Sequence, residues 1–251
     1  MNIVIAGYGF VGKAHALWLE YEHNVTIYDP AMGYGDIHTQ FDNADGVIIC
    51  VSTPEGENGE CDMSNVYNVI EKCNPGTPIL IKSTISLEGW RLIKRAYPYE
   101  KIAFSPEYLR AAHAIEDFKS NNTMQIGGDS EFWVKTFAYS TVTIINGFDV
   151  EELIMIKYLR NSFLACKVAF FNQVYDMCEN AGIDYETVRN GVAADKRIGD
   201  SHTIVTEDRG YGGHCFPKDV AAIIASGYKS GTDLSILAEV QSYNERLKLV
   251  E

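Results

Sequence analysis

The first half of the chain alternates short, continuous apolar runs with segments of helical period, and this alternation limits the fold more than any other feature. The apolar runs cover residues 3–7, 25–29, 46–51, 78–84, 101–106 and 123–128. Segments that suit helices follow or separate them, at residues 12–22, 64–73, 88–96 and 130–138. Runs without polar alternation are typical of strands covered on both faces. The pattern therefore predicts an α/β fold with a doubly wound parallel sheet.

The second half is helical. From residue 150 to Gly182, apolar residues recur with roughly the helical period. A helix of this length either bridges domains, forms a dimer seam, or lies buried in a helical bundle. A second helix is expected from about Tyr185, a polar loop at residues 199–214, and further helices after Pro217. We therefore expect two domains, residues 1–148 and an all-α central, dimerisation domain at residues 149–251.

Charge and cysteine content exclude several classes of protein. A net charge of -13 disfavours a phosphate backbone, and hence nucleic acid, as the main partner. No apolar run reaches the ~20 residues that span a bilayer, and the N-terminus lacks the basic region of a signal peptide. Six widely spread cysteines form no CxxC pair, which argues against a disulfide framework and against a structural metal. We expect a cytoplasmic protein without a membrane partner.

A glycine motif follows the first predicted strand directly. Gly7, Gly9 and Gly12 belong to GYGFVG, and a predicted helix begins there. In this context the glycines allow a tight turn, close approach of a pyrophosphate, and close packing of helix on strand. Asp29 ends the second predicted strand, where a carboxylate accepts ribose hydroxyls and repels a 2′-phosphate. The motif predicts a Rossmann-like domain that binds NAD; the alternative is a glycine turn without a ligand.

Six further motifs occur in a fixed order. They are VSTP at 51–54 (with Gly59 and Asp62 after it), KST at 82–84, SPEYLR at 105–110, KYLRN at 157–161, RIG at 197–199 and GYGGHCFPKD at 210–219. Together they resemble the UDP-glucose/GDP-mannose 6-dehydrogenase family from end to end, most specifically in the GGxCFPKD loop. The resemblance implies NAD-dependent oxidation of a nucleotide sugar, such as UDP-glucose, at its sixth carbon to the uronate.

This chemistry explains why a cysteine is needed. Conversion of an alcohol to an acid takes two hydride transfers, with an aldehyde between them. A thiolate that captures the aldehyde gives a thiohemiacetal, which is oxidised to a thioester. Cys215 matches the family nucleophile, and Lys218 and nearby backbone amides are placed to lower the pKa of its thiol. The alternative, a buried structural cysteine, is the interpretation that we keep for Cys50, Cys73, Cys166 and Cys178.

The resemblance also implies the roles of polar residues around this cysteine. Lys157 and Asn161, one helical turn apart, hold the substrate oxygen and an ordered water, with Asp219 and Thr84 near that water. Glu107 matches the general base of thioester hydrolysis. Each one alone could be an ordinary surface or capping residue; the whole set at these intervals favours catalysis. The remaining implied contacts are to the cofactor at Phe10, Val11, Thr53, Thr84 and Lys218, and to the substrate at Tyr108, Leu109, Arg110, Lys157, Asn161, Arg197, Tyr211 and Gly212.

Arg197 has two interpretations of equal weight. By resemblance it reaches the sugar pocket of a neighbouring subunit, which implies a homodimer. The alternative is a solvated loop charge.

The sequence departs from the family pattern at two places. Ala111 stands where a second glutamate usually follows Glu107. The chain also ends at Glu251, before the third domain that grips the nucleotide in the family. It is therefore a piece of a longer enzyme, a short form completed by a partner or its own dimer, or a protein for a smaller substrate. Remote contacts orient a substrate, so the sequence does not choose the sugar.

Two other functions remain open. A two-electron hydroxyacid dehydrogenase of the 6-phosphogluconate type also has a Lys-x-x-x-Asn pair, as at Lys157 and Asn161, but needs no cysteine. A catalytically silent NAD-binding protein is the third possibility, favoured by Ala111 and disfavoured by the complete catalytic set.

Overall fold

The computed structural model describes residues 1–35, 39–98, 100–109, 116–117, 123–138, 142–213 and 215–249. The chain divides into two compact units. The first unit consists of Met1–Pro54 and Cys61–Lys157, and the second of Glu55–Glu60 and Tyr158–Glu251. Arg110 and Ala111 lie outside the described residues. The functional boundary expected after residue 148 remains a prediction.

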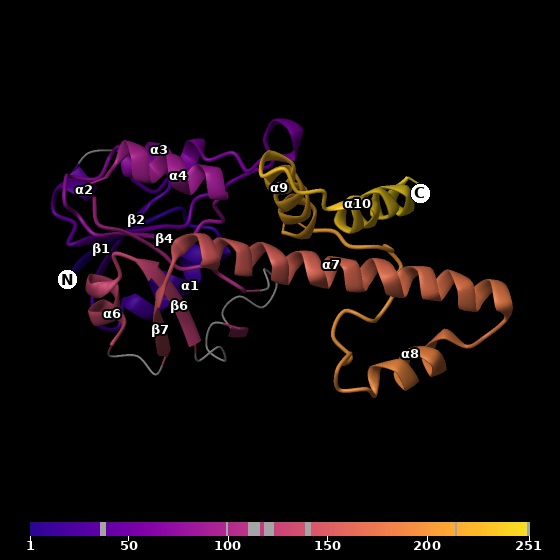
Figure 1. Ribbon diagram of the computed structural model, residues 1–251. Helices are drawn as coiled ribbons and strands as arrows, with labels where there is room; N and C mark the ends of the chain where they lie inside the picture. The colour runs from indigo at the N-terminus through magenta and orange to yellow at the C-terminus, as the bar shows by residue number, and fades with distance from the viewer. Residues whose placement is uncertain are drawn as a thin grey trace. The chain divides into compact units, whose positions relative to one another are not determined.

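The first unit contains one seven-stranded sheet with strand order β2-β1-β3-β4-β5-β6-β7 (Figure 1). The strands are β1 Asn2–Ala6, β2 Asn24–Tyr28, β3 Gly46–Ile49, β4 Ile79–Ile81, β5 Ile102–Phe104, β6 Thr123–Gly128 and β7 Thr143–Phe148. Strand β1 pairs in parallel with both β2 and β3, so the chain winds to one side of β1 and then to the other. The predicted doubly wound fold is confirmed, and its topological switch point lies between β1 and β3.

One part of the strand prediction is wrong. β6 runs antiparallel to β5, with Phe104 opposite Gly127, and β7 was not predicted. A continuous apolar run shows that a strand is covered on both faces, but it does not specify direction. β7 is exposed or half-buried along its whole length, which explains why it lacks a continuous apolar run.

Helices cover both faces of this sheet (Figure 1). They are α1 Phe10–Leu19, α2 Thr39–Asp42, α3 Ser64–Ile70, α4 Leu87–Ala96 and α6 Glu131–Phe137, with a short 3-10 helix η1 at Pro30–Met32. Leu19 of α1 and Trp133 and Phe137 of α6 pack against strand residues such as Ile5 and Ile48 in one buried cluster. Burial of each such side chain stabilises the fold by roughly 1.5–3 kcal/mol, and this packing holds α1 against the sheet.

Helix α7, Val150–Ala181, contributes to both units and confirms the long helix predicted from residue 150. It ends at Gly182, whose φ of 67° is left-handed, and the amide of Ile183 donates back to the carbonyl of Cys178 over 2.9 Å. The other elements of the second unit are η2 Glu57–Gly59, α8 Tyr185–Ala193, α9 Phe216–Lys229 and α10 Ser235–Lys248. Pro217 lies in the first turn of α9, where a missing amide hydrogen costs nothing.

All six cysteines, each among the described residues, are free thiols. Within the described part of the chain, no helix combines the length and the apolar character that crossing a bilayer requires.

Candidate functional site

The turn from β1 into α1 has the geometry of a dinucleotide loop. Gly7 has a φ of 95°, and a Cβ there would lie 2.6 Å from backbone atoms of Cys50 and Val51. A Cβ on Gly12 would lie 2.0 Å from the carbonyl oxygen of Gly7. At Gly9, the residue before α1, a Cβ would meet nothing within 4 Å. The outer two glycines thus allow tight packing, and Gly9 leaves open space at the amino end of the helix, as a pyrophosphate needs.

Asp29 follows β2 and lies against this turn. Its Oδ2 accepts a hydrogen bond of 2.7 Å from the amide of Tyr8, and its Oδ1 accepts one of 3.2 Å from the amide of Met32. These bonds fix the carboxylate beside the glycine turn and at the start of η1. The arrangement fits NAD, whose ribose hydroxyls such a carboxylate recognises.

Polar residues after β3 and β4 meet at the same edge of the sheet. Thr53 is buried, and Thr84 is half-buried. Ser83 was not singled out from the sequence, yet its hydroxyl donates to the carbonyl of Val51 over 2.7 Å. The thiol of Cys61 contacts the carbonyl of Thr84 at 3.5 Å. The loops that hold the predicted threonines are therefore joined by side-chain bonds.

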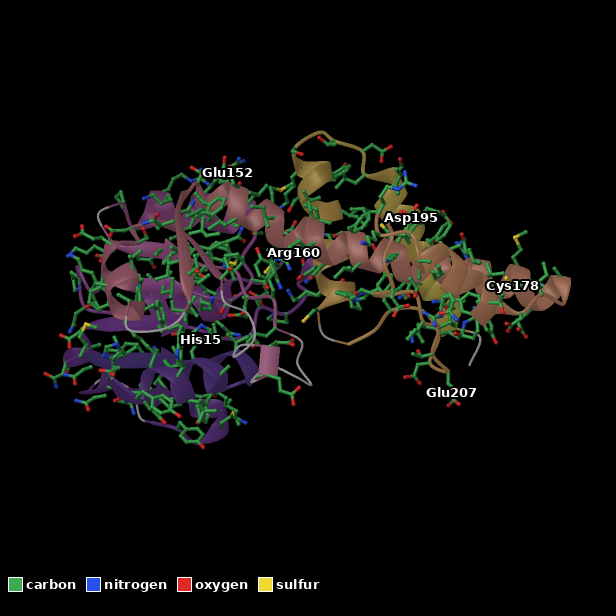
Figure 2. All side chains as sticks on the ribbon, turned by 90° about the horizontal axis from the view of Figure 1, so that it is seen from below. His15, Glu152, Arg160, Cys178, Asp195 and Glu207 are labelled. Carbon is green, nitrogen blue, oxygen red and sulfur yellow. The ribbon has the colours of Figure 1, made fainter. Side chains whose placement is uncertain are left out.

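Glu107 lies in a cluster that the motifs did not indicate. Its Oε2 is 3.2 Å from Lys82 Nζ and 3.8 Å from His15 Nε2. Its Oε1 accepts a hydrogen bond of 2.9 Å from the amide of Tyr108. Lys82 also donates to the hydroxyl of Ser105 over 2.9 Å. His15 lies on α1 (Figure 2) and is completely buried, and Lys82 is nearly so.

The surroundings decide which of these groups is charged. Burial raises the pKa of Glu107, but the positive charge of Lys82, the charge interaction with His15 and the hydrogen bonds from Tyr108 and Lys82 outweigh burial and hold the pKa below its ordinary value. Burial and then the charge of Lys82 lower the pKa of His15 to about 4. At neutral pH the cluster therefore contains an ionised glutamate and a neutral histidine.

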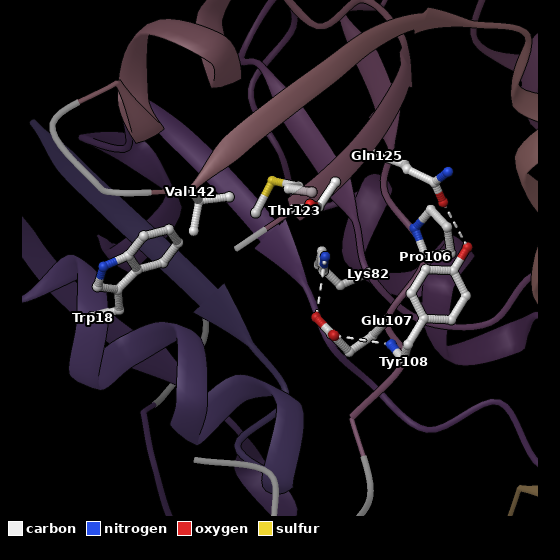
Figure 3. Close-up of a pocket in the computed structure, with 9 residues that line it drawn as sticks. Trp18, Lys82, Pro106, Glu107, Tyr108, Thr123, Gln125 and Val142 are labelled. Atoms are coloured by element: carbon white, nitrogen blue, oxygen red, sulfur yellow. Dashed lines mark hydrogen bonds and ion pairs between the residues drawn. The ribbon is translucent and has the colours of Figure 1, made fainter. Parts of the chain in front are cut away.

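A shallow pocket adjoins this cluster (Figure 3). The residues that line it are Trp18, Lys82, Pro106, Glu107, Tyr108, Thr123, Met124, Gln125 and Val142. The hydroxyl of Tyr108 donates to Gln125 Oε1 over 2.9 Å, which joins the SPEYLR loop to β6. Leu109 is buried against Ala14 and Phe10 of α1, so the same loop is also anchored to the helix of the glycine turn.

Lys157 contacts the SPEYLR loop within the first unit. Its Nζ donates to the backbone carbonyl of Glu107 over 2.5 Å and lies 5.5 Å from the centre of the Tyr108 ring. The side chain is buried, as expected of a lysine that supplies charge within a site. Asn161 lies one turn further along α7.

Within the second unit, Asp219 connects two of the predicted residues. Its Oδ2 accepts a hydrogen bond of 2.6 Å from Asn161 Nδ2, and its Oδ1 lies 2.6 Å from Lys218 Nζ. Asp219 is only 1% exposed, so this carboxylate is held by both partners away from water. The contact joins α7 to the first turn of α9.

Cys215 is the residue directly before α9. It is half-buried, and its carbonyl oxygen accepts a hydrogen bond of 2.9 Å from the amide of Asp219. The first amides of a helix have no partner within the helix and favour a negatively charged group nearby. Cys215 and Asp219 are therefore placed on the same first turn, with the sulfur at the end that favours an anion.

The loop before Cys215 is anchored from α10. The amide of Tyr211 donates to Asn244 Oδ1 over 2.7 Å, and Asn244 Nδ2 donates back to the carbonyl of Tyr211 over 3.0 Å. Tyr211 is buried and Gly212 is exposed. Arg197 is paired with Asp195 of its own loop, and its side chain is 89% exposed. The predicted substrate residues of the second unit are thus in different environments.

Sequence reasoning missed the residues that support the predicted ones. His15 lies on the apolar side of a helix, and Lys82 was noted only as the first letter of KST. Ser105 was noted only as the first letter of SPEYLR, and Asn244 belongs to no distinctive spacing. Their roles depend on distances between elements far apart in the chain, such as the 33 residues between Tyr211 and Asn244. A single sequence gives no signal for such contacts.

Comparison with known proteins confirms the resemblance. Residues 32–138 match the NAD binding domain of the UDP-glucose/GDP-mannose dehydrogenase family, and residues 151–246 match its central domain. The chain is 32% identical to the UDP-glucose 6-dehydrogenase of Rickettsia typhi over 295 residues, covering 98% of this chain and 67% of that protein.

Solved structures show the same relationship. A UDP-glucose dehydrogenase from Pyrobaculum islandicum superposes with a TM-score of 0.85 at 26% identity, covering 98% of this chain and 68% of that one. A 3-hydroxyisobutyrate dehydrogenase from Mycobacterium tuberculosis shares the fold, with a TM-score of 0.72 at 17% identity and 92% of its length covered. The chain spans about two thirds of the length of its Rickettsia and Pyrobaculum relatives. It belongs to the UDP-glucose/GDP-mannose dehydrogenase family and has the NAD-binding and central domains of these NAD-dependent enzymes.

Proposed function

We propose that this chain oxidises a nucleotide sugar, UDP-glucose or a close analogue, at its sixth carbon to the uronate through a covalent intermediate on Cys215. The observation that supports the proposal most is the buried contact of Asn161, Asp219 and Lys218 at the start of α9, the helix that Cys215 precedes. Burying a carboxylate in a helical bundle costs free energy, so we expect Asp219 to have a function. Holding a water molecule beside the reactive sulfur of Cys215 would be such a function.

The dinucleotide is held by the glycine turn and Asp29 in this proposal. Open space at Gly9 admits the pyrophosphate, and the carboxylate of Asp29 accepts hydrogen bonds from the ribose. NAD, when bound, supplies the hydride acceptor for both oxidations. Thr53 and Thr84, at the loops after β3 and β4, are the proposed side-chain contacts to it.

The first oxidation removes a hydride from carbon six and a proton from its hydroxyl group, giving an aldehyde. The thiolate of Cys215 then adds to the aldehyde carbon, and the resulting oxyanion is stabilised by Lys157 and by a water bound to Asn161 and Asp219. Removal of a second hydride converts the thiohemiacetal to a thioester. The sulfur thus keeps the substrate in place between the two oxidations.

Glu107 acts last. Water attacks the thioester carbon, Glu107 takes one proton from it, and the carbon–sulfur bond breaks to return the thiolate. The contact with Lys82 keeps Glu107 ionised and ready to accept this proton. Ala111 removes the second glutamate of the family pattern, so we propose that Glu107 performs hydrolysis with the partners described here.

The remaining parts of the proposal concern assembly. The functional division is residues 1–148 for NAD and residues 149–251 for the cysteine loop and dimerisation. Arg197 is exposed, and among its described hydrogen bonds it is held only by Asp195. In a homodimer through the helical domain, it would bind the sugar of the neighbouring subunit. A cytoplasmic location suits the free thiols.

NADH release over a panel of UDP-glucose, GDP-mannose, UDP-N-acetyl sugars and simple hydroxyacids tests the proposal. The expected result is two NADH for each nucleotide sugar and no acid formation by Cys215→Ser, with NAD binding intact. Unchanged turnover by Cys215→Ala would refute the covalent step.

A two-electron hydroxyacid dehydrogenase is the second candidate. The 3-hydroxyisobutyrate dehydrogenase fold, of which this chain covers 92%, supports it only as an architecture. It would give one NADH for each hydroxyacid, independent of Cys215. If the chain binds NAD but turns over none of these compounds, the third interpretation, a catalytically silent NAD-binding protein, would be supported.

A further inference from the structure

The residues Asp208–Tyr211, which we call the anchor loop, lead into the glycines before Cys215. Two of them have a left-handed backbone, with a φ of 48° at Arg209 and 59° at Gly210. This conformation is ordinary for glycine and uncommon for a residue with a Cβ. An arginine in this region of φ indicates that its side chain makes contacts that hold the backbone there.

Asn172 of α7 provides the first of these contacts. It is 1% exposed, and its Oδ1 accepts a hydrogen bond of 2.8 Å from Nε of Arg209 and one of 3.1 Å from the amide of Gly210. Its Nδ2 donates to the carbonyl of Val168, one turn earlier on α7, over 2.9 Å. The two loop nitrogens only donate, so they determine that the oxygen of this amide is turned toward the loop.

The rest of the guanidinium connects the loop to two helices. Nη2 of Arg209 lies 2.6 Å from Asp176 Oδ1, and its Cζ lies 4.9 Å from the centre of the Tyr175 ring. Asp176 Oδ2 accepts a hydrogen bond of 3.2 Å from the hydroxyl of Tyr243 on α10. Charge-assisted bonds and aromatic rings beneath a guanidinium are stronger than neutral contacts. One side chain thus joins the anchor loop to α7 directly and to α10 through a carboxylate.

Helix α10 holds the other residues of the anchor loop. Asn244 exchanges two hydrogen bonds with the backbone of Tyr211, and a Cβ at Gly210 would lie 2.4 Å from Asn244 Oδ1. Lys248 Nζ donates to the carbonyl of Asp208 over 2.6 Å. Each of the four loop residues is therefore bonded to or packed against a helix of the second unit.

The stretch that follows the anchor loop is held at its ends. Tyr211 and Phe216 pack in one apolar cluster, with ring centres 6.4 Å apart. Between them Gly212 and Gly213 are exposed, and among the described residues a Cβ at either would meet nothing within 4 Å. Glycines contribute no side chain that could hold this stretch. The position of Cys215 therefore depends on how firmly the two ends are anchored.

We propose that Arg209 is a positioning residue for Cys215: by fixing the anchor loop to α7, its guanidinium keeps the sulfur where it captures the aldehyde. The inference depends on the proposed covalent role of Cys215. In capture the carbon–sulfur bond forms and the carbonyl electron pair moves to the oxygen, and the second hydride then leaves the same carbon for NAD. A displaced sulfur misses this step, so the aldehyde leaves after one hydride transfer.

Product stoichiometry tests the proposal, because partial unfolding lowers the amount of active enzyme without changing the NADH formed for each sugar consumed. Arg209→Met keeps the length of the stem but has no donor. With UDP-glucose and semicarbazide as aldehyde trap, we expect trapped aldehyde to rise about tenfold and NADH for each sugar to fall from two toward one. Arg209→Lys, which retains a charge for Asp176, should restore part of both.

Hydrogen exchange tests the contact without turnover. The amides of Gly210 and Tyr211 donate to the buried side chains of Asn172 and Asn244, which protects them from exchange. In Arg209→Met, exchange measured by NMR should be about tenfold faster at Gly210, because the loop has lost its guanidinium contacts to α7. Unchanged exchange would show that Arg209 does not hold the loop.

Arg246→Met is the matched control. Arg246 also lies over a tyrosine ring, that of Tyr243 at 5.8 Å, and pairs with Glu239 at 2.8 Å, but both partners belong to its own helix. This variant should match the wild type in stoichiometry and exchange. Equal aldehyde release by the two methionine variants, or two NADH for each sugar without trapped aldehyde in Arg209→Met, would overturn the inference. A wild type that forms one NADH or none would instead refute the proposed function, and the exchange result would still decide whether Arg209 holds the loop.

Discussion

Asn161 donates a hydrogen bond of 2.6 Å to Asp219, and neither side chain is more than 9% exposed. The two residues are 58 positions apart, on α7 and α9, so the bond is a tertiary contact that fixes the start of the cysteine helix. Buried polar pairs of this kind contribute to stability only when both members are present.

Asp219→Ala should therefore destabilise the second unit. The amide of Asn161 would lose its buried acceptor and Lys218 its counter-charge, so we expect the free energy of unfolding to fall by about 2–4 kcal/mol. Urea unfolding measures it. Asp195→Ala removes a carboxylate whose partner Arg197 is largely exposed, and should cause no measurable change. Equal stability of the two variants would show that the buried bond contributes nothing.

Two glycines of the turn between β1 and α1 should affect different properties: substitution of Gly9 should weaken cofactor binding, and substitution of Gly12 should destabilise the fold. Gly9→Ala introduces a methyl group into open space at a φ of -71°, so stability should change by less than about 0.5 kcal/mol while NAD affinity falls at least tenfold. Gly12→Ala places a Cβ 2.0 Å from a backbone oxygen, and should cost about 2 kcal/mol or more of stability. Calorimetric titration and thermal unfolding measure both.

Gly191→Ala is the control for these glycine variants. Gly191 lies inside α8, and a Cβ at this position would meet nothing within 4 Å. Alanine there should raise helix stability by about 0.5–1 kcal/mol and leave NAD affinity unchanged. Tight NAD binding by Gly9→Ala would contradict the proposed approach of the pyrophosphate.

Asp29→Ala should weaken NAD binding about tenfold and reduce the preference for NAD over NADP, because the carboxylate that accepts the ribose hydroxyls and repels a 2′-phosphate is lost. Fluorescence titration with NADH and NADPH measures both affinities. Asp45→Ala is the control. The carboxylate of Asp45 also accepts a hydrogen bond from a backbone amide, that of Asn2 at 2.7 Å, but Asp45 precedes β3, whereas Asp29 follows β2. The ribose assignment fails if both variants bind NADH as the wild type does.

Stability should depend on pH through His15. The unfolded chain protonates this histidine near pH 6.5, whereas the folded chain keeps it neutral down to about pH 4. Between these values the unfolded state binds more protons, so stability falls as pH falls, by about 3 kcal/mol in total. The loss should be complete below the folded pKa. Urea unfolding at several pH values should show this slope in the wild type and a smaller one in His15→Gln.

The sequence predicted the parts of the molecule that depend on local pattern. Apolar runs located six strands, the spacing of Gly7, Gly9 and Gly12 located the dinucleotide turn, and helical periodicity located α7 almost to its ends. These features are encoded within a few neighbouring residues. The reversal of β6 was not predicted, because direction is determined by the connection between strands and not by the strand itself.

The candidate site was predicted as a set of residues, but not as a set of contacts. Motif order named Glu107 and Asp219, whereas the partners that hold them, His15 for one and Asn161 for the other, come from distant elements. The chemistry of a buried carboxylate depends on those partners. A pattern of residue types does not contain the distances that decide whether a glutamate is ionised.

The reversed strand β6 has a consequence for how the pocket beside Glu107 can change in size. Because Phe104 pairs with Gly127, the first half of β6 extends beyond the end of β5, and Gln125 reaches Tyr108 from there (Figure 3). One side of the pocket is thus formed by sheet instead of by loop. Enlarging that side would require a shift of pairing along a whole strand, so a substitution that widens the pocket would act first on the opposite, helical side, at Trp18.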